Sequence, residues 1–251
     1  MYRFHQLLTA THNPARVNEV RTPSAAMLAG VHIEACVAEL LGFSPWLPDG
    51  VTFTTDDRQM YLTQASRAVE VLKEFGPFVY QPSLAWPNAV DPLAEGHPDF
   101  IAIHTHHIVD LKTTDYPTEE MLDKLLHSVQ MCAYMAAYYR YNNMWPKLSI
   151  VLASRLAEPA PVKFNKDGTV ALSGQTADHA ALAEAVELMG DKADDRHWNL
   201  VFKAPVWEPV LSATLDEQQC EQLAKVGEIF LDAGLAILET GLADMVHRPY
   251  A

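Results

Sequence analysis

Cysteine is scarce in this sequence: the chain has three, Cys36, Cys132 and Cys220, and they lie far apart. An odd number of widely spaced cysteines is unlike the disulfide framework of a small secreted domain, and unlike the paired spacing of a cysteine-rich metal site. We therefore expect reduced thiols, as in a cytoplasmic protein. Long hydrophobic runs are also missing, which predicts no membrane span. Residues 1–6 lack the basic start of a secretory signal peptide.

Positive charge is in short supply as well. The chain has 18 Lys and Arg against 32 Asp and Glu, a net charge of −14. Binding to phosphate chains depends on clustered Lys and Arg, so this balance excludes a protein that holds nucleic acid mainly by its overall charge. It does not exclude an enzyme that acts on phosphodiesters, because a bound divalent cation supplies local positive charge. We expect such an enzyme to bind its polymer modestly, or with help from a partner or from its own oligomer.

The distribution of apolar residues predicts a mixed fold. The composition, with 49% hydrophobic and 20% charged residues, is that of a folded chain, and 251 residues can bury a full core. Helical and strand-like spacings alternate along the chain. Helices are predicted over 25–41, 57–75 and 117–141, and strands over 78–86, 99–104, 107–112 and 148–153. This order predicts an α/β (α+β) fold, in which helices flank a small mixed β-sheet.

The last part of the chain is less regular. Asp167-Gly168 is typical of a hairpin turn, and the pattern beyond it predicts a helix over 178–189, a strand over 199–207 and a long amphipathic helix over 216–246. No linker composition separates this part from the rest. We therefore expect a single domain over residues 1–251, with a core over about 24–153 and a C-terminal decoration over about 154–251.

The residues that indicate chemistry lie in the middle of the chain. Asp99 follows Gly96-His97-Pro98, and ten residues separate it from Asp110-Leu111-Lys112. If Thr105 and His106 form the turn of an antiparallel hairpin, Asp99 lies opposite Lys112. Paired residues share a face and strand side chains alternate, so Asp99, Asp110 and Lys112 then project from one face. A three-residue turn without a bulge would move Asp99 to the other face.

The predicted helices on either side carry further polar residues. Helix 25–41 contains Gly30-Val31-His32, and helix 117–141 contains Gln130 and Tyr134, which are four apart and share a face. A helix with His, a strand with Pro-Asp, a strand with Asp-x-Lys and a helix with Gln-x-x-x-Tyr follow in order. This series resembles the PD-(D/E)XK nuclease superfamily, and within it the RecB-like and phage-exonuclease branch. The resemblance covers about residues 24–153 and implies a restriction-endonuclease-like core.

The resemblance also implies a metal site. Asp99 and Asp110 would ligate Mg²⁺ or Mn²⁺, His32 would add a nitrogen ligand, and the carbonyl of Leu111 would complete the shell. Carboxylate oxygens suit both cations, and one imidazole shifts the preference toward Mn²⁺. Family members often have a glutamate on the preceding strand, where this chain has Gln81. That difference leaves either one metal ion or a weaker second site.

The remaining roles implied by the resemblance concern catalysis and substrate. Lys112 would orient or activate the attacking water and offset charge in the transition state, and Gln130 and Tyr134 would position the substrate. The implied activity is that of a metal-dependent deoxyribonuclease, an exonuclease of recombination or repair in the cytoplasm of a bacterial or phage-infected cell. DNA is the implied partner, and a homo-oligomer or a recombination protein is a further candidate.

Two alternatives share this core. One is a structure-specific endonuclease of the CRISPR-adaptation type; those relatives use four cysteines for an iron–sulfur cluster, and three scattered cysteines predict no such cluster here. The other is a nucleic-acid-binding protein that keeps the fold without turnover. The presence of Asp99, Asp110 and Lys112 together weighs against the second alternative.

Other polar residues near these motifs receive structural interpretations. Glu34 and Glu39 are expected on a solvated helix face, and His97 is expected to have a structural role. The three histidines of the hairpin are expected in an exposed turn, because no Cys or His pair lies at zinc-site spacing; they are His104, His106 and His107.

Overall fold

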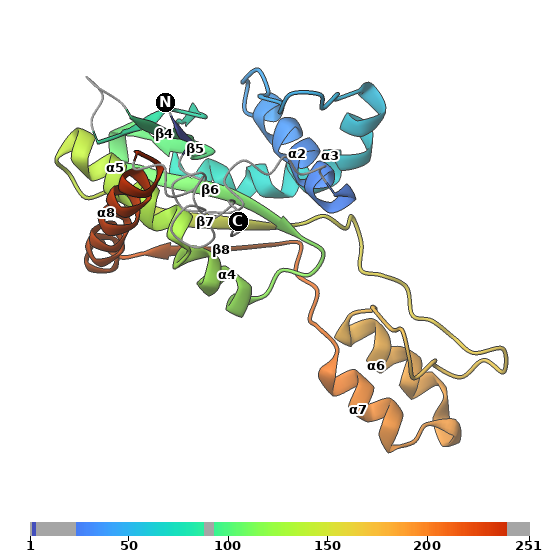
Figure 1. The fold of residues 1–251 in the computed structure, drawn as a ribbon. Coiled ribbons are helices and arrows are strands. Elements are labelled where there is room, and N and C mark those ends of the chain that lie inside the picture. The colour runs from blue at the N-terminus through green and yellow to red at the C-terminus, as the bar shows by residue number, and fades with distance from the viewer. Residues whose placement is uncertain (1, 4–23, 88–92, 240–251) are drawn as a thin grey trace, which may run out of the picture.

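The computed structural model of the chain describes residues 2–3, 24–87 and 93–239. It confirms the predicted fold class, because a five-stranded mixed β-sheet lies between layers of helices (Figure 1). The strand order is β2-β5-β6-β7-β8, with β6 and β7 parallel and the other neighbours antiparallel. The strands are β2 (Val79–Tyr80), β5 (Phe100–Ala102), β6 (His107–Thr114), β7 (Lys147–Ser154) and β8 (Val210–Leu215).

Helices cover both faces of this sheet. On one face, Val109 and Leu111 of β6 pack against α2 (Ala25–Leu40) and α3 (Thr55–Leu72). On the other face, Ile108 of β6 packs with residues of α4 (Glu119–Leu126), α5 (Val129–Asn142) and α8 (Glu217–Glu239). Side chains along a strand alternate between faces, so Asp110 and Lys112 project from β6 toward the α5 layer.

The single helix predicted over 117–141 is two helices in the structure. The first ends at Leu126, and the hydroxyl of Ser128 caps the second by accepting from the backbone N–H of Met131. A serine side chain at this position satisfies one of the N–H groups that the first turn of a helix leaves unpaired. The break lets α5 run along the sheet in its own direction.

The strand predicted over 78–86 is also divided. Gln81 has a left-handed backbone (φ 48°), which ends β2, and the chain then forms β3 (Leu84–Trp86) in a different sheet. This second sheet has three strands in the order β1-β4-β3, with β1 at Tyr2–Arg3 and β4 at Ala94–Gly96. Residue 81 therefore marks the corner between the two sheets.

A small lobe is inserted between β7 and β8 and projects from the main body (Figure 1). It contains α6 (His179–Leu188) and α7 (Asp195–Lys203) around its own apolar core, which includes Leu182, Val186 and Val201. The predicted turn at Asp167-Gly168 is confirmed, with Gly168 at φ 81°. The strand predicted over 199–207 is wrong, because Asp194 and His197 form a capping box that begins α7.

The boundary predicted at residue 154 does not match the packing. Strand β8 pairs along β7, and Cys220 and Leu231 of α8 lie in the same core as α5. The decoration is therefore the inserted lobe, while the long terminal helix belongs to the main body. The part of the predicted helix from residue 240 onward lies outside the described residues. Within the described ranges, no helix has the length and apolar character needed to cross a membrane.

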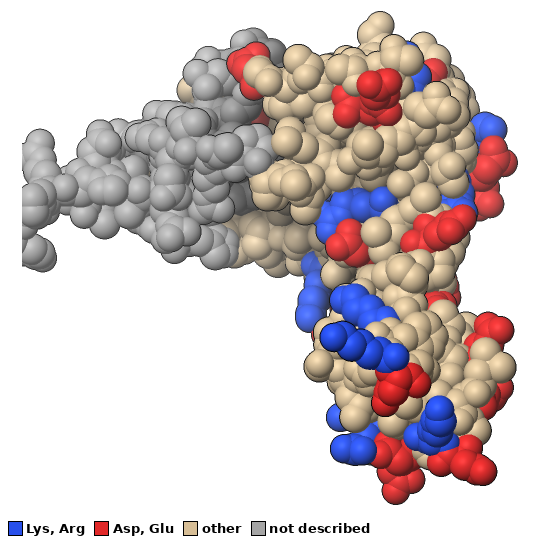
Figure 2. Space-filling model, turned by 90° about the vertical axis from the view of Figure 1, so that its right-hand side faces the viewer, with Lys and Arg blue, Asp and Glu red and all other residues tan. Residues whose placement is uncertain are grey.

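The charged side chains are unevenly distributed on the surface that Figure 2 shows. Lys and Arg gather where the inserted lobe joins the main body, whereas Asp and Glu are scattered over both parts. At this junction Arg67 donates to the carbonyl oxygen of Ala157 (2.8 Å) and lies over the ring of Trp207 (5.4 Å). Arg155 forms an ion pair with Asp115 (2.9 Å). These contacts tie the base of the lobe to α3 and to the end of β6.

Candidate active site

The hairpin that carries the acidic motifs has a longer turn than predicted. Ala102 pairs with His107, so residues 103–106 make the connection: a short 3-10 turn, then His106 in a left-handed conformation (φ 50°). The expected pairing of Asp99 with Lys112 is therefore wrong by two residues. A shift of two preserves the face to which each side chain points. Asp99 remains on the side of Asp110 and Lys112, and its carboxylate accepts the backbone N–H of Leu111 (2.7 Å).

The histidines of this hairpin are less exposed than expected. His107 is buried at the start of β6, where it contacts the hydroxyl of Ser149 (2.8 Å). His106 contacts the hydroxyl of Tyr138 (2.9 Å), and only His104 is exposed in the turn. These three residues do not point at one another, and none lines the acidic pocket described below.

Asp110 is the most deeply buried acid of the site. It is 1% exposed, and one carboxylate oxygen forms an ion pair with the ammonium of Lys112. The other oxygen, Oδ1, has no hydrogen-bond partner among the described residues. An unpartnered carboxylate oxygen in the interior is costly, unless a cation or another donor compensates it.

The charges of the site influence one another. Burial disfavours the ionised form of Asp99, and the negative charges of Asp110 and Glu34 raise its pKa further above the usual range. Burial opposes the charged form of Lys112, but Asp110 and Asp99 outweigh it and raise the pKa of this lysine. The three carboxylates of this site, opposed by one lysine, leave an excess of negative charge. A bound cation would reduce the repulsion between them.

Glu34 joins the two aspartates, although its helix face was expected to be solvated. Its carboxylate accepts hydrogen bonds from the hydroxyl of Tyr80 (3.0 Å) and from the amide of Gln81 (2.8 Å). Burial raises the pKa of Glu34. The positive charge of Lys112 lowers this pKa and the negative charge of Asp110 raises it, and the net result is a raised pKa. The expectation of a solvated glutamate is therefore wrong for Glu34. Glu39 is partly exposed on the same helix, where it forms an ion pair with Arg58 (2.5 Å).

The structure does not bring His32 to the acidic residues. Its Nε2 donates to the carbonyl oxygen of Thr52 (3.0 Å), and its Nδ1 lies 3.3 Å from the carboxylate of Asp57. Its ring packs beside Phe53 and Tyr61. An α-helix has 3.6 residues per turn, so His32 and Glu34, which are two positions apart, face different sides of α2. The predicted ligand role of His32 has no support in its position.

A close contact between helix and strand explains how Glu34 reaches the site. A Cβ atom on Gly30 would lie 2.8 Å from Oγ1 of Thr113, so the lack of a side chain at residue 30 lets α2 approach β6 without displacing the threonine side chain. Glu34 follows one turn later on the same face of the helix. The sequence therefore contained a signal for Glu34 as a site residue: it is an acid four residues after a glycine, on a helix next to the Asp-x-Lys strand.

Gln81 connects Glu34 to Asp99. Its backbone N–H donates to the carbonyl oxygen of Asp99 (2.9 Å), and its side-chain amide donates to both Glu34 (2.8 Å) and Asp99 Oδ1 (3.3 Å). The carbonyl oxygen of Gln81 accepts from Nδ1 of His97 (3.4 Å). A left-handed backbone is uncommon for a residue other than glycine, and such conformations gather at functional sites. Here the conformation places one amide between two carboxylates.

The two residues predicted on α5 reach the same place. Gln130 is exposed and donates to the hydroxyl of Tyr134 (2.9 Å), which in turn donates to the carbonyl oxygen of His97 (2.8 Å). Tyr134 is buried, and burial together with the charges of Asp110 and Asp99 raises its pKa. The pair therefore borders the acidic residues from the side of α5. Leu111 contributes its backbone N–H to Asp99, and the role of its carbonyl stays a prediction.

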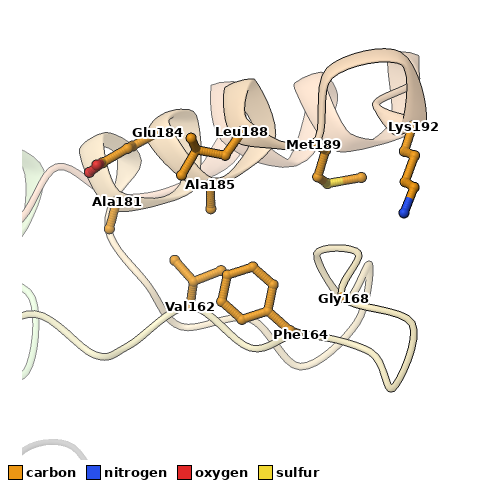
Figure 3. Close-up of a pocket in the computed structure, with 9 residues that line it drawn as sticks. All are labelled: Val162, Phe164, Gly168, Ala181, Glu184, Ala185, Leu188, Met189 and Lys192. Carbon is orange, nitrogen blue, oxygen red and sulfur yellow. The ribbon is translucent and has the colours of Figure 1, made fainter.

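Two cavities differ in their chemistry. The first has a volume of about 440 Å³ and is lined mostly by residues with polar side chains: Glu34, Trp46, Gln81, Glu95, His97, Asp99, Gln130 and Tyr134. The second, of about 570 Å³, lies in the inserted lobe (Figure 3). Its wall is largely apolar, with Phe164 and Leu188 facing each other across it and Lys192 at one end. The acidic pocket is the candidate active site, because it alone of these two gathers carboxylates, a histidine and amide donors.

The acids that line the pocket, together with Asp110 buried beside them, fit a hard divalent cation. Glu34, Asp99 and Asp110 offer only oxygen ligands, as Mg²⁺ and Mn²⁺ prefer. Within the described residues, no group of three His, Cys, Asp or Glu side chains is already spaced as a metal cage. The unpartnered Oδ1 of Asp110 is the observation that supports a cation here.

The three cysteines lie on different helices. Cys36 is on α2, Cys132 on α5 and Cys220 on α8, and all three are buried. Burial raises the pKa of each thiol to about 11, which favours the protonated form. They behave as small apolar residues of the core.

Comparison with solved structures gives a structural likeness. No family model matches the chain, and no curated protein matches it. Among solved structures, the chain is similar to a phage-related exonuclease from Haemophilus somnus 129PT, with 13% sequence identity, 95% of each chain covered and a TM-score of 0.38.

A matched pair of glutamates on α2 tests which residues bind the ion. We expect saturating Mn²⁺ to raise the melting temperature of the protein by about 5–10 °C, since an ion at 100 times its Kd adds about 2.7 kcal/mol. Glu34→Gln is expected to reduce this rise by about half or more, because it removes one ligand charge. Glu39→Gln, on the outer face of the same helix, and His32→Gln should leave the rise unchanged. Thermal unfolding with and without Mn²⁺ measures it, and a rise that depends on His32 but not on Glu34 would contradict the assignment.

Proposed function

We propose that the chain is a metal-dependent deoxyribonuclease that hydrolyses phosphodiester bonds at DNA ends, in the recombination or repair of a bacterium or its phage. The observation that supports this function best is the pairing of buried Asp110 with Lys112, close to Asp99 and to Glu34 of α2. Carboxylates that can hold a divalent ion next to a lysine provide what phosphodiester hydrolysis requires. The order of the motifs along the chain supports the same assignment.

The proposed activity requires a bound divalent cation. Glu34, Asp99 and Asp110 would hold Mg²⁺ or Mn²⁺, which when bound polarises the phosphate and lowers the pKa of the attacking water. Asp99 is fixed for this role from two sides, by the N–H of Leu111 and by the amide of Gln81. Fixed ligands reduce the reorganisation needed when the transition state forms.

Lys112 acts as a positive charge in this scheme. Asp110 and Asp99 favour its ammonium form and raise its pKa, so it offsets charge on the phosphate oxygens and orients the attacking water by hydrogen bonding. Gln130 and Tyr134 line the opposite part of the pocket. Gln130 positions the nucleotide through its amide group, and Tyr134, whose hydroxyl accepts from Gln130 and donates to the carbonyl of His97, holds that amide in place.

DNA with labelled ends distinguishes this activity from the alternatives. We expect linear 5′- or 3′-labelled DNA to be shortened progressively in Mg²⁺ or Mn²⁺ and to remain intact with chelator. Cleavage of circular DNA, or discrete internal cuts, would instead indicate a structure-specific endonuclease. Binding without cleavage under every condition would indicate a protein that keeps the fold without turnover. RNA of the same sequence, run in parallel, shows whether the sugar is recognised.

A further inference from the structure

Trp46 is an unusually exposed tryptophan beside the acidic pocket. Its side chain is 56% exposed, whereas Trp86 is fully buried and the other three tryptophans are partly buried. Tryptophan is large and mostly apolar, so exposure of its ring is unfavourable unless a partner covers it. The ring lines the same pocket as Glu34 and Asp99.

The segment around Trp46 presents the ring in a fixed position. Pro45 and Pro48 flank it and restrict the backbone. The N–H of Trp46 donates to the hydroxyl of Tyr80 (3.3 Å), and that hydroxyl donates to Glu34 (3.0 Å). Phe43 stacks on the ring of Tyr80 (5.6 Å between centroids). The backbone of Trp46 is therefore one hydroxyl away from a carboxylate of the site.

The pocket combines three features that a single nucleotide satisfies. It has acidic residues that can hold a cation and, through it, a phosphate; the exposed side-chain amide of Gln130; and the aromatic side chain of Trp46. Bases stack on aromatic side chains whatever their sequence. The volume of about 440 Å³ lies in the range of sites for small molecules, and a double helix is far wider.

We propose that Trp46 is a stacking platform for an unpaired base next to the scissile phosphate, so that the site takes single-stranded or frayed DNA ends. This inference rests on the proposed nuclease function, since the phosphate is placed by the acidic residues. It names a substrate class, because the pocket is far narrower than a double helix, so a base must leave its pair to enter the pocket beside Trp46. Trp46 then governs substrate binding, and Lys112 and Asp110 govern the chemical step.

The first experiment measures stacking without hydrolysis. A DNA oligonucleotide with 2-aminopurine at its end is titrated with the protein in Ca²⁺, and the fluorescence of that base is followed. We expect quenching with the wild-type protein and with Trp46→Phe, and little quenching with Trp46→Ala. Binding of the single strand is expected to weaken about tenfold in Trp46→Ala, since a stacked base contributes about 1–3 kcal/mol. Phe202→Ala, which removes a 75% exposed aromatic from the inserted lobe, serves as the matched control.

The second experiment uses turnover in Mn²⁺ on single-stranded, frayed and blunt-ended DNA. Trp46→Ala is expected to raise KM about tenfold on the first two substrates and to change kcat less than about twofold. Equal quenching and equal KM in wild type and Trp46→Ala would overturn the proposal, as would an equal loss in Phe202→Ala. Quenching that depends on Trp46 in a protein that hydrolyses no DNA would keep the stacking site and reject the nuclease, so the two ideas fail separately.

Discussion

Asp110→Asn is expected to lower the rate of DNA hydrolysis at least about 10³-fold, the size of effect seen when a group that stabilises transition-state charge is removed. The substitution keeps the shape of the side chain but removes a negative charge from the centre of the site. Asp110 is 1% exposed and has one oxygen without a partner among the described residues, so water cannot substitute for the lost ligand. Initial rates on end-labelled DNA in Mn²⁺ measure the effect.

The same substitution nearby provides the control. Asp115 follows the end of β6 and pairs with Arg155, with its side chain 55% exposed. Asp115→Asn is expected to leave the rate within about twofold of wild type, because an exposed ion pair contributes little. Lys112→Ala should lose activity as Asp110→Asn does, and the melting temperature of each variant shows that it is folded. Hydrolysis that survives both Asp110→Asn and Lys112→Ala would place the active site elsewhere.

The layout of the central sheet could be predicted because burial is strong there. Strand β7 is buried on both faces, and its continuous apolar run needs no tertiary information to be recognised. For the hairpin, the prediction was right about the face that carries the polar residues and wrong about the length of the turn. Its turn is longer than predicted, yet the shared face of Asp99, Asp110 and Lys112 depends only on whether the shift is even.

The sequence did not predict the features that depend on tertiary contacts. Glu34 has the appearance of a surface glutamate, but Tyr80 and Gln81, which are far away in the sequence, donate hydrogen bonds to its carboxylate. His32 has the appearance of a ligand, but its polar partners are Thr52, in the loop that follows α2, and Asp57, in the first turn of α3. The same limit applies to residues 199–203, which are strand-like by composition and become helical because Asp194 caps α7.

Gly227 has the closest neighbouring atoms of the glycines that the structure describes, and its substitution has the largest expected effect on stability. A Cβ atom on Gly227 of α8 would lie 2.0 Å from the carbonyl oxygen of Cys132 on α5. This oxygen belongs to backbone and cannot rotate away, so any side chain forces the two helices apart. Gly227→Ala is expected to lower the free energy of unfolding by about 3 kcal/mol or more, as overpacking in a core does.

The sign of the Gly227→Ala effect makes the test decisive. In an exposed helix, replacement of glycine by alanine stabilises by about 1 kcal/mol, so helix propensity alone predicts the opposite result. Val226→Ala, at the 42% exposed neighbouring position of the same helix, should change stability by less than about 0.5 kcal/mol. Unfolding in urea, followed by circular dichroism, measures both variants. Because α5 also carries Gln130 and Tyr134, a shifted helix should raise the KM for DNA in whatever fraction of Gly227→Ala remains folded. An unchanged or increased urea midpoint would show that α5 and α8 do not approach so closely.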